Sequence, residues 1–233
     1  CYIWNIDYVT DIAREYKKLC PSVPIWVGGP EVSYEVEAFL RENPYIDGVM
    51  IGEGEDTFRE LCGYYAHKRK LSDIAGIAFR KNSTGNSTSN RTSVNNAGCK
   101  AGEIVFTSPR PIKNMSEIPF CYDTLDDFSN RIIYYESSRG CPFSCSYCLS
   151  SVDKTLRFRN TEIVKRELKF FIDQKVPQIK FVDRTFNCNH AHAMELWRFI
   201  KANDNGVTNF HFEISADLLN QEELELISDM RPG

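Results

Sequence analysis

The sequence lacks any long apolar run and any large excess of charge of one sign. A membrane-spanning helix needs about 18 or more consecutive apolar residues, and no stretch of this chain approaches that length or resembles a signal peptide. The formal net charge is −4 over 233 residues, without the basic excess typical of nucleic-acid-binding domains. We therefore expect neither a membrane nor a nucleic acid among the partners.

The sequence also lacks the even, spread-out set of cysteines that marks a secreted disulfide framework. It has nine cysteines, an odd number, and three of them fall in the stretch 141–148. This pattern favours a reducing compartment, and we expect a cytoplasmic protein. A composition with 42% hydrophobic and 26% charged residues is that of an ordinary globular protein.

The most informative feature present is the cysteine triplet itself. Cys141, Cys145 and Cys148 have the spacing C-x3-C-x2-C, and neither a histidine nor a fourth cysteine follows closely. A closed zinc site takes four protein ligands, and so do common iron–sulfur clusters. Three thiolates on one short loop therefore indicate a cubane cluster with one iron left open. Two other interpretations are a zinc site with a distant fourth ligand, and a disulfide with a spare thiol.

The residues around the triplet favour the cluster. Residues 131–138 are rich in Ile and Tyr and predict a strand, and Arg139-Gly140 then turns into the loop. A helix follows over 161–174, with Thr161 as its expected N-cap. Strand, cysteine loop and helix in this order, with Tyr147 before the third cysteine, resemble the radical S-adenosylmethionine (radical SAM) superfamily.

That resemblance implies the cofactors. Cys141, Cys145 and Cys148 would hold a 4Fe-4S cluster whose open iron chelates S-adenosylmethionine, and Tyr147 would belong to the same binding site. The reduced cluster would cleave S-adenosylmethionine to a 5′-deoxyadenosyl radical, which abstracts hydrogen from an unknown substrate. A low-potential electron donor such as flavodoxin or ferredoxin is implied as a partner.

The first part of the chain alternates predicted helices and strands. Short apolar runs at 24–27 and 48–51 predict buried strands, and helices are expected over 7–19, 31–42 and 57–69. The first helix carries Ile12, Tyr16 and Leu19 on one side. Such alternation predicts a doubly wound parallel sheet, in which ligands bind at the carboxyl ends of the strands.

Glycines follow both predicted strands and carry a second resemblance. Val27-Gly28-Gly29-Pro30-Glu31 and the later run at 51–55, Ile-Gly-Glu-Gly-Glu, resemble the C-terminal half of a cobalamin-binding domain. The resemblance implies that Gly28 and Gly29 lie beside the nucleotide tail of cobalamin, where only residues without side chains let it approach. The D-x-H-x-x-G motif that ligates cobalt would precede Cys1. The alternative is a Rossmann-like domain that binds nothing.

The predicted fold class is α/β, in three parts. Residues 1–70 form a partial cobalamin-binding-like (flavodoxin-like) Rossmann domain. Residues 71–125 form a β-hairpin and linker, including a polar insertion at 82–102. Residues 126–233 form the first half of a radical SAM partial (β/α)6 TIM-type barrel, with strands at 131–138, 178–183 and 209–215. We expect the chain to be truncated at both ends.

Three more site residues are predicted at the strand ends. Asp183 stands where many members of the superfamily carry Gly-Gly-Glu, which implies an acceptor for the methionine amino group; the alternative is a helix N-cap or a salt bridge with Arg184. Glu213 and Ser215 share one side of their strand. They are candidates for the ribose or carboxylate of S-adenosylmethionine, or for an internal polar network.

The sequence therefore predicts a radical SAM enzyme, with cobalamin-dependent methyl transfer, or a rearrangement or cyclisation, as its reaction. One alternative is a radical SAM enzyme whose Rossmann-like domain no longer binds cobalamin. An alternative of another class is a zinc-stabilised, non-catalytic binding module.

Overall fold

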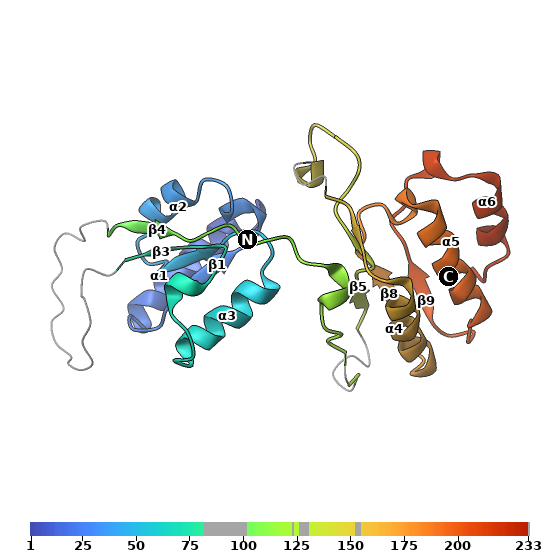
Figure 1. Cartoon of the computed structure of the whole chain (residues 1–233), viewed down its shortest axis with the longest axis horizontal. Helices are drawn as coiled ribbons and strands as arrows, with labels where there is room; N and C mark the ends of the chain where they lie inside the picture. The colour runs from blue at the N-terminus through green and yellow to red at the C-terminus, as the bar shows by residue number, and fades with distance from the viewer. Residues whose placement is uncertain (82–101, 123, 126–130, 152–154, 233) are drawn as a thin grey trace. The chain divides into compact units, whose positions relative to one another are not determined.

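The computed structural model describes residues 1–81, 102–122, 124–125, 131–151 and 155–232, in two compact units, Cys1–Ile112 and Lys113–Gly233 (Figure 1). Nearly all of the insertion predicted at 82–102 lies outside the described residues. In the described parts of the chain, no helix is long and apolar enough to cross a membrane.

The first unit is a four-stranded sheet with three helices. In spatial order its strands are β1 (Trp26–Gly28), β2 (Gly48–Met50), β3 (Ile77–Arg80) and β4 (Ile104–Phe106). β1 and β2 pair in parallel, and the other two pairs are antiparallel. The helices are α1 (Ile6–Leu19), α2 (Val36–Glu42) and α3 (Glu55–Tyr65). The hairpin expected at 71–125 thus extends this sheet, while the three-part division of the chain stays a prediction.

Helices pack on both faces of this sheet, because side chains alternate along each strand. Val27 and Val49 join a buried cluster with α1 and α2, whereas Trp26 and Met50 pack with Leu61 of α3. Parallel strands are normally buried on both faces in this way. The predicted α/β class is confirmed for this unit.

Helix α1 turns much of its apolar surface outward. Ala13 is 6% exposed and faces the sheet, while Ile12, Tyr16 and Leu19 are 67%, 45% and 82% exposed. The three residues predicted to share one side of this helix are therefore exposed.

The second unit contains three parallel strands, each followed in the chain by a helix. The spatial order of strands is β5 (Ile133–Tyr135), β8 (Gln178–Phe181) and β9 (Asn209–His211). The helices are α4 (Thr161–Asp173), α5 (His190–Ala202) and α6 (Gln221–Ser228) (Figure 1). A separate antiparallel pair is formed by β6 (Ser138–Arg139) and β7 (Arg157–Phe158). The α/β class is confirmed here too.

The core of this unit lies between the sheet and its helices. Ile133 and Phe181 are buried with Leu168 and Trp197 of the helices. The opposite side of the sheet carries Tyr134, which is 56% exposed. This second face is the one that a barrel would enclose.

Two local predictions need correction. The strand expected over 131–138 is interrupted, since β5 ends at Tyr135 and β6 begins at Ser138. The N-cap of α4 is Asn160, whose Oδ1 accepts from the backbone N–H groups of Glu162 and Ile163. The prediction of Thr161 was wrong because a stronger capping residue precedes it.

Candidate cluster and cofactor site

The cysteine loop leaves and rejoins the fold through the β6–β7 pair. Ser138 lies opposite Phe158, and Arg139 opposite Arg157. Gly140 opens the loop with a φ of 99°, and a Cβ there would lie 2.5 Å from the carbonyl oxygen of Thr155. Only glycine tolerates both conditions, so the turn before Cys141 requires a glycine.

The three predicted ligands differ in exposure. Cys141 and Cys148 are half-buried and Cys145 is exposed, and every cysteine that the structure describes is a thiol. Among the described residues, no three His, Cys, Asp or Glu side chains converge as a metal site. Three thiols on one loop suit three corners of a 4Fe-4S cluster, and their ligand roles remain predictions.

The carboxyl ends of the three parallel strands meet at one edge. The Sγ of Cys141 lies 3.8 Å from the Oγ1 of Thr185, beyond β8. The backbone N–H of Phe186 donates to the carbonyl oxygen of Glu213 at 2.9 Å. The fully buried amide of Asn187 accepts from the N–H of Ser215 and donates to its carbonyl oxygen, each at 2.9 Å. Active sites of β/α barrels gather at this edge.

Glu213 and Ser215 are brought to this edge, with their side chains engaged. Glu213 is paired with Lys180 at 3.2 Å and its side chain is 48% exposed. The Oγ of Ser215 donates to Asp217 at 2.6 Å. Tyr147 is 92% exposed. Contacts of these three residues with S-adenosylmethionine stay predictions.

Asp183 is fully buried and holds the two residues that lead into the loop. Its Oδ1 accepts from the backbone N–H of Ser137 at 2.8 Å, and its Oδ2 accepts from the hydroxyls of Ser137 and Ser138 at 2.6 and 2.7 Å. Burial raises the pKa of Asp183 to about 6, against the lowering effect of the serine hydrogen bonds. The predicted contact with the methionine amino group is not tested by this arrangement.

His192 was not predicted as part of the site. It is 6% exposed, and its Nε2 lies 3.1 Å from the Oγ of Ser137. Burial lowers the pKa of His192 to about 4, so the imidazole is neutral. The signal was present in the sequence, because spacings of four residues place His192 on one helix face with Leu196 and Ile200.

A buried ion pair anchors the chain just after β7. Arg159 donates to both carboxylate oxygens of Glu167, at 3.1 and 2.6 Å. The hydroxyl of Tyr135 donates to the same carboxylate at 2.6 Å, and the pKa of Tyr135 is raised by burial and by this bond. Arg159 also donates to the carbonyl of Met115 at 2.6 Å.

Comparison with known families identifies both units. Residues 1–62 match the B12 binding domain, and residues 135–232 match the radical SAM superfamily. The chain belongs to the radical SAM superfamily and has an N-terminal B12-binding-type domain. The predicted family is confirmed, together with the cluster and S-adenosylmethionine as the cofactors that define it.

Several relatives of this radical SAM protein carry methyltransferase names. It is 32% identical to an uncharacterized methyltransferase, PH0819, of Pyrococcus horikoshii, over 82% of this chain and 39% of the relative. It is 29% identical to the cobalamin-dependent radical SAM methyltransferase TokK of Streptomyces tokunonensis, over 83% of this chain and 28% of the relative. The chain thus spans less than half of either protein.

A solved structure shares the fold. The radical S-adenosylmethionine methyltransferase TsrM from Kitasatospora setae matches with a TM-score of 0.66 and 19% identity, over 96% of this chain and 42% of that one. At this identity the match supports the fold alone.

The glycines of the B12-binding-type unit fall into two groups. Gly29 has a φ of 106°, and a Cβ there would lie 2.7 Å from the carbonyl oxygen of Cys1. Gly28 tolerates a Cβ at 3.4 Å from Met50. At Gly52 and Gly54 a Cβ would meet no atom within 4 Å. The loop after β2 therefore faces open space at both glycines, whereas the backbone at Gly29 itself requires glycine. The predicted contact of Gly28 and Gly29 with cobalamin stays a prediction.

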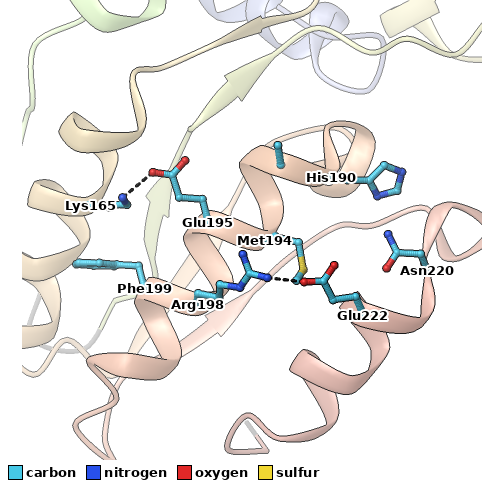
Figure 2. Close-up of a pocket in the computed structure, with 9 residues that line it drawn as sticks. Lys165, His190, Met194, Glu195, Arg198, Phe199, Asn220 and Glu222 are labelled. Carbon is cyan, nitrogen blue, oxygen red and sulfur yellow. Dashed lines mark hydrogen bonds and ion pairs between the residues drawn. The ribbon is translucent and has the colours of Figure 1, made fainter.

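A surface pocket lies between α4, α5 and α6. Figure 2 shows the ion pairs that cross it, Lys165 with Glu195 and Arg198 with Glu222, both 2.5 Å long. None of the predicted site residues lines this pocket.

Proposed function

We propose that the protein containing this chain is a radical SAM enzyme that transfers a methyl group with the help of cobalamin. When bound, the 4Fe-4S cluster supplies the electron that cleaves S-adenosylmethionine reductively. The observation that carries the proposal is the C-x3-C-x2-C loop at the carboxyl edge of three parallel strands. The methyltransferase names of the relatives support methyl transfer as the reaction.

The residues of the chain have distinct parts in this proposal. Cys141, Cys145 and Cys148 hold the cluster. Around them, the polar groups of the strand-end edge orient S-adenosylmethionine; these are Tyr147, Asp183, Glu213 and Ser215. In the other unit, Gly28, Gly29 and the open loop at 52–54 admit the nucleotide tail of cobalamin.

Two further features follow from the chemistry. The cluster needs a reductant of low potential, for which flavodoxin and ferredoxin are the candidates. Thiolate ligands must remain reduced, so we infer that the protein works in the cytoplasm.

The test is the metal content of the full-length protein reconstituted without oxygen. We expect about four irons and four sulfides for each cluster, with loss of both in Cys145→Ala. Cys62→Ala is the matched control, because Cys62 is another exposed thiol but lies in α3 of the first unit. One zinc and no sulfide would overturn the proposal and favour a zinc-stabilised binding module.

Methyl transfer needs its own measurement. Cobalamin absorbance after anaerobic loading tests binding in the first unit, and mass spectrometry of 5′-deoxyadenosine and S-adenosylhomocysteine tests the reaction. A loaded cluster without bound cobalamin would leave the radical SAM assignment standing and overturn the methyl transfer.

A further inference from the structure

Both arms of the cysteine loop converge on His192 of α5. On the leading arm, the Oγ of Ser137 lies 3.1 Å from Nε2 of the imidazole. On the return arm, the ring of Phe158 lies 4.8 Å from the imidazole, centroid to centroid. Phe186, beyond β8, lies at 6.2 Å. One buried side chain therefore contacts the chain just before and just after the loop.

The direction of the hydrogen bonds follows from the number of protons. The Ser137 hydroxyl has one proton and donates it to Oδ2 of Asp183 at 2.6 Å. Its oxygen is then left to accept from His192, which must carry its proton on Nε2. The result is a directed chain from His192 through Ser137 to Asp183, which also accepts from Ser138.

We infer that His192 is a positioning residue for the cluster loop, acting through Ser137 and Asp183 on the backbone that leads to Cys141. The inference rests on the proposed function. His192 would touch neither the cluster nor S-adenosylmethionine. It belongs to the outer groups that orient metal ligands, whose loss typically costs 10–100-fold in metal affinity or activity.

The chemistry of the site explains why an imidazole is present. An apolar side chain would fill the space beside Phe158 and Phe186 equally well. A buried imidazole instead brings an N–H group that needs an acceptor, and the Ser137 hydroxyl provides it. The hydrogen bond to the leading arm is thus what histidine adds at this position.

The first experiment uses the full-length protein without cofactors, so that its result does not depend on the cluster. Backbone hydrogen exchange over residues 136–141 is compared among His192→Leu, His192→Gln and wild type. We expect exchange about tenfold faster in His192→Leu, since a buried hydrogen bond is lost, and a wild-type rate in His192→Gln, which keeps an N–H donor.

Two variants control for folding and for location. His190→Leu alters a histidine of the same helix whose partner is Glu223 in α6, and we expect wild-type exchange over 136–141. Ser137→Ala removes the hydroxyl between His192 and Asp183 without changing α5. Because this hydroxyl also donates to Asp183, exchange should be at least as fast as in His192→Leu. Wild-type exchange in His192→Leu would overturn the inference, as would equal effects of the Leu and Gln variants.

The second experiment examines the reconstituted cluster by iron content and by electron paramagnetic resonance with S-adenosylmethionine added. We expect His192→Leu to hold iron about 10–100-fold more weakly and to give an altered signal, with both restored in His192→Gln. Wild-type affinity and signal in His192→Leu would contradict the inference. If the wild type itself assembles no cluster, the proposed function fails, while the exchange experiment still decides the role of His192.

Discussion

The strand ends of the two units are built from opposite kinds of residue. In the first unit, β1 and β2 run into glycines, and the loop at 52–54 faces open space. In the second unit, the strand ends carry Ser137, Asp183 and Asn187, all fully buried and hydrogen-bonded. Glycine makes room for a ligand, whereas buried polar side chains fix the backbone before any ligand arrives. At the ends of their strands, the first unit thus has open space, and the second unit has a fixed backbone.

The ion pairs of the two units also differ, in how far their side chains are buried. Arg159 and Glu167 in the second unit have side chains 7% and 5% exposed. In the first unit, Arg110 and Glu60 are 15% and 17% exposed. The charges of the ion pair in the second unit are therefore more completely removed from solvent than those of the pair in the first unit.

The largest effect is expected for Arg159→Met. It leaves the buried Glu167 carboxylate without its cation, which typically costs about 3–5 kcal/mol of unfolding free energy. Urea unfolding of the protein measures this loss. Lys169→Met breaks an exposed pair with Asp173, with side chains 47% and 56% exposed, and should cost less than about 1 kcal/mol. Arg110→Met should fall between them; a loss as large as that of Arg159→Met would break the comparison.

The second prediction concerns pH and Asp183→Asn. The pKa of Asp183 is raised from its ordinary 3.8 to about 6, so its contribution to stability is present below the lower value and is lost as pH rises through the higher one. At about 1.4 kcal/mol for each pKa unit, the whole effect is about 3 kcal/mol, and the wild type should lose roughly 2.4 kcal/mol of it relative to Asp183→Asn between pH 4 and 7.

His192 acts in the opposite direction and is present in both proteins. Its pKa is lowered from 6.5 to about 4, so its contribution is present above pH 6.5 and is lost as pH falls. The difference between the two unfolding curves therefore reports Asp183 together with any change that its substitution causes in His192, to which Ser137 links it. Parallel curves for the wild type and Asp183→Asn would show that the carboxyl titrates near its ordinary value.

Contiguous patterns in the sequence predicted much of this fold. The cysteine triplet, the glycines after short apolar runs and the helix periodicity each lie within a few residues, and the helix expected over 161–174 is observed as α4, Thr161–Asp173. The contacts that build the site are instead long-range. Asp183 and His192 both contact Ser137, from 46 and 55 positions away in the sequence. No local pattern encodes such a pairing. The same bonds lie where the strand predicted over 131–138 is interrupted.

The third prediction compares two glycines. Gly140→Ala forces an L side chain into a positive φ and against Thr155, and we expect a loss of about 1–3 kcal/mol. Gly54→Ala places a methyl group in open space at a φ of −91°, so the expected change is within about 0.5 kcal/mol. Thermal unfolding measures both. If Gly54→Ala also weakens cobalamin binding, the open space belongs to the ligand; equal losses of stability would remove the distinction.

The smallest effect is expected on α1. The sequence gives this helix and α4 similar apolar stripes, but α4 buries Val164, Leu168 and Phe171, whereas Ile12 of α1 is 67% exposed. Ile12→Gln should therefore change the unfolding free energy of the 233-residue chain by no more than about 0.5 kcal/mol. The informative step is to repeat the measurement in the full-length protein. A cost above about 1 kcal/mol there would mean that other residues cover this face of the first unit, because replacing a solvent-exposed side chain by a polar one does not destabilise a fold to that extent.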